Sequence, residues 1–211
     1  DIMNDLMSLG MHRLWKKRLV EIVDLKENEI VLDVGSGSGD IATEILKENL
    51  PTSLYLLDLN KEMLLEGRKR LKKEKNIKYF IGNAEKLNFE NNFFDKYTIS
   101  FCLRNVTEYL LSIKEAYRVL KPGGKYCCLE FSTPKSSLVS ISYKIYKSKI
   151  LPLLGEIVAK DKNAYKYLSE SIDLFPSQEE LSKNLRDCGF TKVETINLFN
   201  GIVAIHTGYK L

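Results

Sequence analysis

"VLDVGSGSGD", residues 31–40, decides the fold class, because it joins a predicted strand to a predicted helix through a glycine-rich turn. The apolar run over 29–35 is typical of a parallel strand that is covered on both faces. The glycines at positions 35, 37 and 39 allow a tight turn and the close approach of a ligand to the backbone. From Asp40 onward, apolar residues recur four apart, as in an amphipathic helix.

The same alternation continues along the chain. Further strands are expected at 53–60, 78–84, 94–101 and 126–132. Helices are expected at 40–50, 61–74 and 111–120, the last stopped by the Lys-Pro-Gly-Gly sequence at 121–124. Such a β-α order predicts a parallel sheet with helices on both faces.

The C-terminal part departs from this order. A helix is expected at 177–190 with Ser177 as its N-cap, followed by strands at 193–199 and 202–211. Only Asn200 and Gly201 separate these two strands, which indicates a hairpin and therefore one antiparallel strand. The predicted fold class is α/β: a Rossmann-like, seven-stranded, mostly parallel sheet with a C-terminal antiparallel hairpin. This pattern is typical of methyltransferases that use S-adenosylmethionine.

Composition limits the class of protein. The 211 residues are 44% hydrophobic and 28% charged, as in a soluble globular domain. Lys and Arg exceed Asp and Glu by 32 − 28 = 4, which argues against nucleic acid as a partner but permits contact with anionic lipid. The four cysteines form no C-x-x-C pair, so buried free thiols in a reducing compartment are expected. No apolar run is long enough for a membrane-spanning helix, and no signal peptide is visible.

The glycine turn predicts a cofactor site that differs from a dinucleotide site. A dinucleotide site is expected to read G-x-G-x-x-G, whereas here Asp40 takes the place of the third glycine. That carboxylate, with Asp33 at the same mouth, repels a pyrophosphate and suits the cationic amino acid end of a sulfonium cofactor. The alternative is a structural turn in which Asp40 caps the helix.

Polar residues at the next two strand ends support the cofactor reading. Asp58 lies 19 residues after Gly39, near the spacing at which an acidic residue meets ribose hydroxyls. Asn83 and the backbone of Ala84 follow the third strand and could read the edge of adenine. Each of these polar groups alone is compatible with a solvated loop. Ligands of open α/β sheets bind at the carboxyl ends of the strands, so polar groups at three successive strand ends together favour a cofactor site.

The chain resembles the ubiquinone/menaquinone biosynthesis C-methyltransferase family from Asp1 to Leu211. The resemblance is carried by "DIMNDLMSLGMHRLW" (1–15), "VLDVGSGSGD" (31–40), "ISFCLRNV" (99–106), "RVLKPGG" (118–124), "LPLLGEIVAKDKNAYKYLSESIDLFPSQEEL" (151–181) and "GIVAIHTGYKL" (201–211). It implies methyl transfer from S-adenosylmethionine to a ring carbon of a polyprenylated benzoquinol or naphthoquinol. The cofactor residues that the resemblance implies are Gly35, Ser38, Asp58, Asn83, Ala84 and Ser100, to which the glycine turn itself adds Asp33 and Gly37.

The chain also departs from the family pattern. Family members usually have threonine at Ser38, many have aspartate at Asn83, and Cys102 replaces a residue that is often glycine. Cys102 therefore predicts a tighter wall near the cofactor. The aromatic residue that the family has just before Asp1 is absent.

Arg104 and Asn105 interrupt the end of an apolar strand and are the main catalytic candidates. Carbon methylation needs an electron-rich ring, a partner for the phenolate and removal of the ring proton. The pKa of arginine is too high for a base, so we expect Arg104 to stabilise the phenolate or orient a water molecule. Asn105 would fix that water molecule or the substrate oxygen. The alternative is that Arg104 pairs structurally with Glu108 or Glu130.

Two further predictions concern the base and the substrate. His12 is a candidate general base, since histidine titrates near neutral pH, although a partly buried helix histidine is the alternative. His206, within the last strand, is expected to be a hydrogen-bonded core histidine. Asp161 and Tyr165 lie one helical turn apart and are proposed to contact the quinol, or else form an exposed pair.

We expect one methyltransferase domain over 1–211. It is divided into cap helices (1–28), a cofactor-binding core (29–132), a substrate-side insert (133–176) and a C-terminal helix and hairpin (177–211). The insert predicts an amphipathic helix before Pro152, with an apolar face and lysines at 144, 147 and 149. This is interpreted either as a helix packed on the sheet or as a lid over a channel for the isoprenoid tail.

The lid interpretation predicts transient contact with a membrane surface. The expected location is the cytoplasm, peripheral to the inner face of the membrane. The expected partners are the polyprenyl quinol, a quinone-biosynthesis complex and a second copy in a homodimer. Three rival functions stay open: an O- or N-methyltransferase, a nicotinamide-dependent oxidoreductase, and a non-catalytic scaffold of a quinone-biosynthesis complex.

Overall fold

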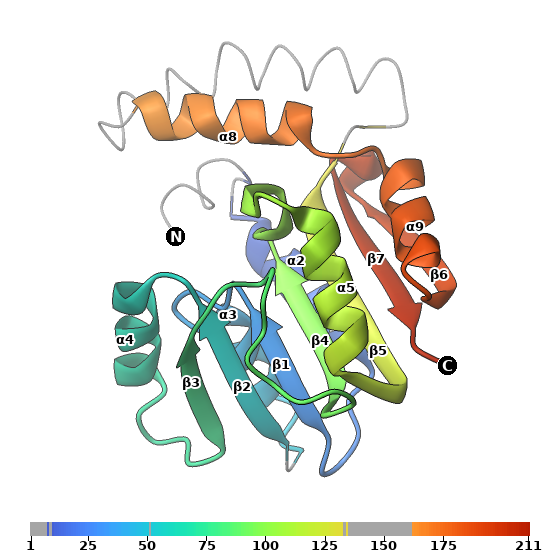
Figure 1. Cartoon of the computed structure of the whole chain (residues 1–211). Helices are drawn as coiled ribbons and strands as arrows, with labels where there is room; N and C mark the ends of the chain where they lie inside the picture. The colour runs from blue at the N-terminus through green and yellow to red at the C-terminus, as the bar shows by residue number, and fades with distance from the viewer. Residues whose placement is uncertain (1–7, 9, 51, 133, 135–161) are drawn as a thin grey trace.

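The computed structural model describes residues 8, 10–50, 52–132, 134 and 162–211, and it contains a seven-stranded sheet of order β3-β2-β1-β4-β5-β7-β6 (Figure 1). The strands are β1 (Ile30–Val34), β2 (Ser53–Asp58), β3 (Ile77–Ile81), β4 (Phe94–Ser100), β5 (Leu120–Phe131), β6 (Thr191–Leu198) and β7 (Val203–Tyr209). The pairs β1–β2, β1–β4, β2–β3 and β4–β5 are parallel, as the sequence predicts.

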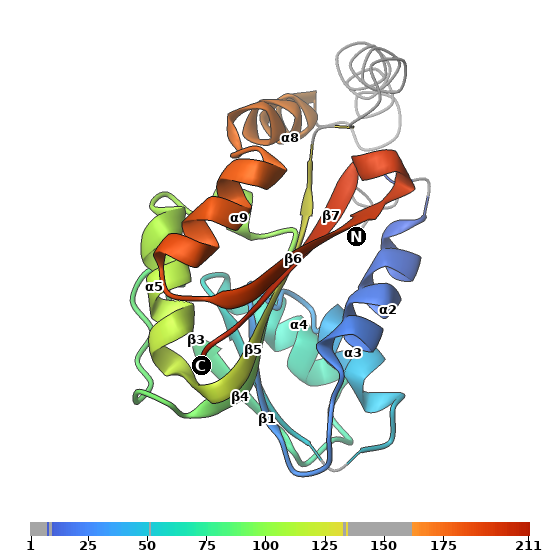
Figure 2. The same ribbon diagram turned by 90° about the vertical axis from the view of Figure 1, so that its right-hand side faces the viewer.

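Helices cover both faces of the sheet. They are α2 (His12–Val23), α3 (Asp40–Leu46), α4 (Lys61–Arg70), α5 (Tyr109–Val119), α8 (Lys162–Leu174) and α9 (Gln178–Asp187). Figure 2 shows α2 and α3 on one face and α5 and α9 on the other. Two buried clusters fill the layers: Leu19, Ile41 and Leu64 contribute to one, and Ile113 and Leu181 to the other. Burial of these apolar faces holds the helices on the sheet.

The predicted hairpin is confirmed. Strand β7 lies between β5 and β6 and is antiparallel to both. A 3-10 turn over Phe199–Gly201 joins β6 to β7, with Asn200 in the left-handed region at φ 55°. His206 is buried in β7 and its Nε2 lies 3.2 Å from the carbonyl oxygen of Gln178, as expected of a core histidine.

The boundaries of several elements differ from the prediction. Strand β5 begins at Leu120, not at 126, because Gly123 donates to the carbonyl of Lys210 and Lys210 donates to that of Gly124. The Pro-Gly-Gly sequence therefore ends the preceding helix and also enters the sheet. Helices α3 and α4 end at Leu46 and Arg70, earlier than predicted. Ser177 caps α9 as expected, accepting from the amide of Glu180.

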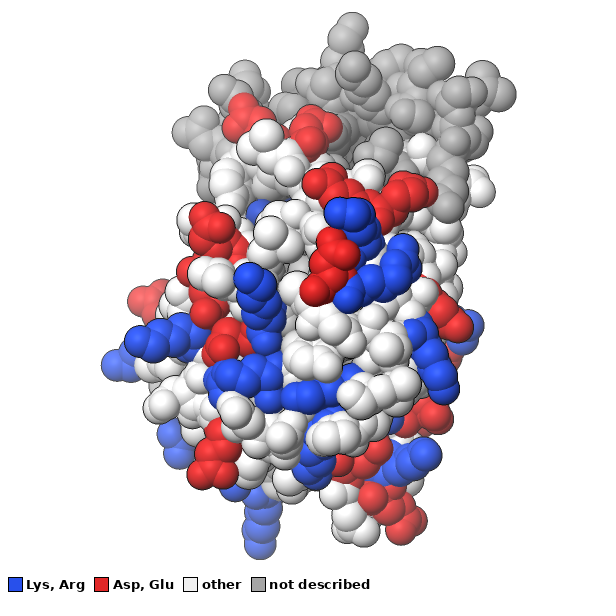
Figure 3. Space-filling view, turned by 45° about the vertical axis from the view of Figure 1, so that its right-hand side comes forward, with Lys and Arg blue, Asp and Glu red and all other residues white. Residues whose placement is uncertain are grey.

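The cysteines and the surface agree with the predicted class. All four cysteines are free, and Cys127 and Cys128 are buried. On the face shown in Figure 3, basic and acidic side chains are interspersed. Among the described residues no helix is long and apolar enough to cross a membrane. The predicted amphipathic helix of the insert lies outside the described residues.

Candidate functional site

The glycine turn after β1 is held against the end of β2. The amides of Gly35 and Ser36 both donate to the carbonyl of Leu57, at 2.8 and 3.1 Å. Gly35, Gly37 and Gly39 have φ values of 66°, 52° and 82°, in the left-handed region that favours glycine. This backbone brings the start of α3 to the carboxyl edge of the sheet, where ligands of α/β folds bind.

Asp58 connects the end of β2 to this turn. Its Oδ2 accepts from the amide of Gly37 and its Oδ1 from the amide of Asn60, both at 2.8 Å. Hydrogen bonds to a carboxylate are stronger than those between neutral groups. Asp58 therefore fixes the shape of the glycine turn and still lines the neighbouring cavity.

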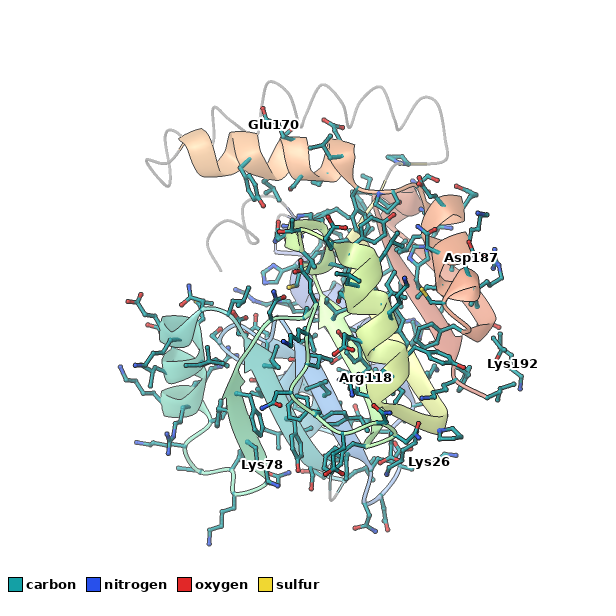
Figure 4. All side chains as sticks on the ribbon, in the orientation of Figure 1. Lys26, Lys78, Arg118, Glu170, Asp187 and Lys192 are labelled. Carbon is teal, nitrogen blue, oxygen red and sulfur yellow. The ribbon has the colours of Figure 1, made fainter. Side chains whose placement is uncertain are left out.

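The segment after β3 forms the opposite side of the cleft. Oδ1 of Asn83 accepts from the amide of Glu85 at 2.9 Å, while Oε1 of Glu85 accepts from the amide of Glu108 at 2.9 Å. Ala84 is buried. Arg118 of α5, labelled in Figure 4, donates to the carbonyls of Leu87 and Phe89 and so fixes the chain that follows. These contacts hold the segment without a ligand.

The largest described cavity at this edge has a volume of about 570 Å³. Asp58, Asn83, Ala84, Cys102 and Asn105 are among the side chains that line it. A smaller cavity of about 170 Å³ lies on the other side of the glycine turn and shares Gly35, Gly37, Met63 and Phe101 with the first. The two cavities form one cleft over the ends of β1, β2 and β4.

Three of the described buried polar atoms that have no protein partner lie at or directly beneath this cleft. They are Oδ2 of Asp33, Oγ of Ser36 and Oγ of Ser100. Ser36 and Ser100 line the smaller cavity, which Ser38 also lines. Because buried polar groups are normally hydrogen-bonded, these atoms indicate a polar ligand at this position. A nucleoside with a charged amino acid end fits this arrangement, with the ribose toward Asp58 and the base toward Asn83.

The structure assigns Asp40 a role that differs from the predicted one. Asp40 begins α3, but its carboxylate pairs with Lys16 and with Arg70, each at 2.5 Å. Burial raises its pKa, but the two cations outweigh burial and lower the pKa to about 2. Asp40 is thus already neutralised and is not free for a cationic ligand. Lys16 also lines the smaller cavity, and no motif in the sequence singles it out.

Asp33 is buried directly beneath the glycine turn. It is 2% exposed, and its Oδ1 accepts from the hydroxyl of Thr98 at 2.8 Å. Burial raises the pKa of Asp33 from 3.8 to about 7, although the hydrogen bond from Thr98 and the charge of Lys16 oppose this. The expected second carboxylate at the mouth is therefore a buried group that titrates near neutral pH.

This shift predicts how stability depends on pH. Between about pH 4 and 7 the unfolded chain loses the proton of Asp33 while the folded chain keeps it. Asp33 should therefore lower the free energy of unfolding by about 1.4 kcal/mol per pH unit as the pH rises through this window, and by no further amount above it. Denaturant unfolding of the wild type and of Asp33→Asn at several pH values measures this contribution of Asp33 to the free energy of unfolding.

The comparison with Asp33→Asn is necessary because His206 acts in the opposite direction. Burial lowers the pKa of His206 to about 4, so its contribution to stability rises between about pH 4 and 6.5. Both proteins contain His206, and its effect cancels in their difference. If the difference in free energy of unfolding between the wild type and Asp33→Asn stays constant from pH 4 to 7, the pKa of Asp33 is not raised.

Arg104 and Asn105 lie in the 3-10 turn η1 (Leu103–Asn105), directly after β4. Asn105 is exposed, lines the large cavity and accepts at Oδ1 from the hydroxyl of Tyr167 of α8 at 3.3 Å. Arg104 instead makes a buried ion pair with Glu130 at 2.8 Å and does not line the cavity. Pairing with Glu130 is the structural alternative that the sequence leaves open.

The remaining predicted site residues are His12, Asp161 and Tyr165, of which only His12 can be placed by its side chain. His12 is buried in α2, with Nδ1 at 3.1 Å from the hydroxyl of Ser8. It lines a separate cavity of about 220 Å³ together with Lys16, Asp40 and Arg70. Asp161 lies outside the described residues, and Tyr165 lies in α8 but its side chain is not described.

Comparisons with known proteins show the family of the chain. The family model of the ubiE/COQ5 methyltransferase family matches residues 1–210. The chain is 49% identical to a protein from Rickettsia bellii (strain RML369-C) named "Ubiquinone/menaquinone biosynthesis C-methyltransferase UbiE", covering 100% of this chain and 88% of the relative. It is 48% identical to the protein of the same name from Rickettsia prowazekii, with the same coverage.

Solved structures resemble the fold at lower identity. A SAM-dependent methyltransferase from Aquifex aeolicus has a TM-score of 0.69 at 18% identity, covering 99% of this chain and 98% of that one. Haemonchus contortus phosphoethanolamine N-methyltransferase 2, in complex with S-adenosyl-L-methionine, has a TM-score of 0.71 at 16% identity, covering 93% of this chain and 52% of that one. The predicted fold class is thereby confirmed.

Proposed function

The chain belongs to the ubiE/COQ5 methyltransferase family, and from this premise we propose that its cleft aligns S-adenosylmethionine with the ring of a polyprenyl quinol. The protein is an S-adenosylmethionine-dependent C-methyltransferase of ubiquinone and menaquinone biosynthesis. Family membership gives no support to the nicotinamide-dependent oxidoreductase. The observation that carries the proposed alignment is that one cavity is lined both by Asp58 and by Asn105.

The proposed cofactor residues divide between the two parts of the cleft. Asp33, Ser38 and Ser100 would hold the amino acid end, while Gly35 and Gly37 let it approach the backbone. Asp58, Asn83 and Ala84 would hold the ribose and the base. The cofactor supplies an electrophilic methyl group when bound. The chain's own task is to orient it and to exclude water.

The quinol ring is proposed to lie beside Asn105. The amide of Asn105 is exposed in the cavity and can donate to a ring oxygen or hold a water molecule that takes the ring proton. Arg104 is proposed to stabilise the phenolate or to orient a water molecule from behind Asn105, with its guanidinium paired to Glu130. His12 remains a proposed general base, although it lines a separate cavity together with Lys16 and Asp40.

Incubation with short-tailed demethyl-benzoquinol and demethyl-naphthoquinol tests the activity and the ring preference together. We expect mass spectrometry to show one added methyl group on a ring carbon of at least one of the two, only when S-adenosylmethionine is present. Methylation of oxygen would instead support the O-methyltransferase. Binding of the cofactor with no product from either ring would support the non-catalytic scaffold.

Location and partners are proposed from the chemistry of the substrate. A polyprenyl quinol resides in the bilayer, so we propose a cytoplasmic enzyme that contacts the inner face of the membrane transiently through the insert over 133–176, where Asp161 and Tyr165 would meet the quinol. A quinone-biosynthesis complex and a homodimer through the insert are further proposals. The division of the 1–211 domain into cap, core, insert and tail is proposed with them.

Liposome flotation measures the membrane contact. Vesicles with anionic lipid should retain the protein at low salt, neutral vesicles should retain much less, and about 0.5 M salt should release it because the attraction is screened. Replacing the lysines at 144, 147 and 149 by glutamine should reduce retention without changing turnover of a short-tailed substrate. Equal retention by neutral and anionic vesicles would refute the electrostatic contribution.

A further inference from the structure

Arg104 and Glu130 form an ion pair directly behind the wall of the large cavity. Nη1 of Arg104 lies 2.8 Å from Oε1 of Glu130, and the two side chains are only 4% and 2% exposed. Among the described residues, Cys102 and Asn105 on either side of Arg104 line the cavity, while Arg104 and Glu130 do not. The pair therefore supports the wall and does not face the cavity.

Glu130 holds Arg104 at two points. Its Oε1 accepts from the guanidinium, and its Oε2 accepts from the backbone amide of Arg104 at 3.3 Å. Oε1 also accepts from the amide of Phe131 at 2.8 Å, which orients the carboxylate relative to its own strand, β5. The guanidinium carbon lies 5.4 Å from the centre of the Phe131 ring, a cation–π distance.

Arg104 extends these contacts to the end of β4. Its Nη1 also donates to the carbonyl of Phe101 at 2.7 Å. Phe101 has φ of 52°, a left-handed conformation that a phenylalanine adopts only when its surroundings impose it. Glu130, Arg104 and Phe101 thus form a chain of contacts from β5 to the turn over 101–105.

Stability alone does not explain a buried pair of this kind. An apolar pair of similar volume often gives a protein equal or greater stability, because burying two charges is unfavourable. A charged pair with directional hydrogen bonds instead fixes geometry. The geometry fixed here is that of the turn which presents Cys102 and Asn105 to the cavity.

We propose that Glu130 is a positioning residue for methyl transfer. It acts through Arg104 to hold the 101–105 turn, and this turn holds Asn105 beside the quinol ring. This inference rests on the proposed function, since alignment matters only if a ring is methylated in this cavity. The glycine turn and Asp58 are held by contacts of their own, so Glu130 should affect alignment and not cofactor affinity.

Glu130→Gln tests the inference with little change in shape. We expect kcat for a short-tailed demethyl-quinol to fall about 10²-fold, because small misplacements of reacting groups cost that much. The Kd for S-adenosylmethionine, measured by calorimetry, should stay within about threefold of the wild type, since each factor of ten needs about 1.4 kcal/mol. Wild-type kcat in Glu130→Gln, or a parallel loss of cofactor affinity, would overturn the proposal.

A double-mutant cycle shows whether Glu130 acts on methyl transfer through Arg104. If Glu130 acts through Arg104, then adding Glu130→Gln to Arg104→Met should lower kcat no further, whereas independent residues would multiply their effects. The apolar pair Glu130→Met with Arg104→Met separates alignment from stability and decides the matter if Glu130→Gln fails to fold. We expect it to recover most of the thermal stability while kcat stays low. Recovery of kcat together with Tm would show that the pair is only structural.

Glu29→Gln is the matched control. Glu29 pairs with Lys96 at 3.4 Å near the start of β4, the end of that strand opposite to the site. It should lower Tm and leave kcat unchanged. A wild-type protein that binds the cofactor but methylates no demethyl-quinol would refute the proposed function itself. An active wild type with an equally active Glu130→Gln would refute this inference alone.

Discussion

Replacing Gly35 by alanine should abolish measurable binding of S-adenosylmethionine. A Cβ atom at Gly35 would lie 2.2 Å from Sγ and 2.5 Å from Cβ of Cys102, far inside van der Waals contact. Gly35 also has φ of 66°, where any other residue costs about 1–2 kcal/mol. Overpacking adds about 1–3 kcal/mol, so the turn should move out of place and the protein should lose thermal stability.

Two further variants separate the contact from the backbone conformation. Gly123 has φ of 82°, and a Cβ atom added there would meet no other atom within 4 Å. Gly123→Ala should therefore show only the conformational cost and keep its cofactor affinity. Cys102→Gly removes the colliding atoms and should restore part of the binding to Gly35→Ala. If it restores none, the collision is not the cause and the turn is sensitive only to its backbone angles.

Replacing Asp58 by alanine should weaken the binding of S-adenosylmethionine by about 10²- to 10³-fold. The amides of Gly37 and Asn60 would lose their acceptor, and hydrogen bonds to charged groups contribute about 1.5–3 kcal/mol each. Asp58→Asn should be intermediate, because its amide has one oxygen and its NH₂ group would face an N–H donor. Calorimetric titration measures the Kd for S-adenosylmethionine of the wild type, Asp58→Ala and Asp58→Asn.

Asp95→Ala is the matched control for Asp58. Asp95 also accepts from a backbone amide, that of Ile30 at 2.9 Å, and pairs with Lys121, but it lies near the start of β4. Its loss should reduce stability and leave cofactor affinity unchanged. Equal weakening of binding in Asp58→Ala and Asp95→Ala would indicate general destabilisation, not a site at the end of β2.

The cleft can be predicted from the sequence because its parts are strand ends. Parallel strands bring their carboxyl ends to one edge, so Asp58, Asn83 and Asn105 are expected to meet without any knowledge of side-chain contacts. The resemblance to the family indicates the substrate class, because the hydrophobic periodicity of the sequence says nothing about the substrate.

The contacts between distant segments cannot be predicted in the same way. Lys16, Asp40 and Arg70 come from three helices, and no spacing in the chain indicates that two cations neutralise one carboxylate. The sequence offers both Glu108 and Glu130 to Arg104, and only packing at the end of β5 decides between them. The Pro-Gly-Gly sequence by itself indicates only a helix stop, because its partner Lys210 lies at the far end of the chain.

The position of Cys102 exposes the enzyme to methylation of its own side chain. Cys102 lies in the wall of the cleft that is proposed to hold S-adenosylmethionine, and a thiolate there would compete with the substrate for the methyl group. Burial, with the negative charges of Glu130 and Asp58, raises the pKa of Cys102 to about 12. At neutral pH only roughly one molecule in 10⁵ carries the thiolate. The chain tolerates a nucleophile at this position because burial, assisted by the charges of Glu130 and Asp58, keeps the thiol of Cys102 protonated.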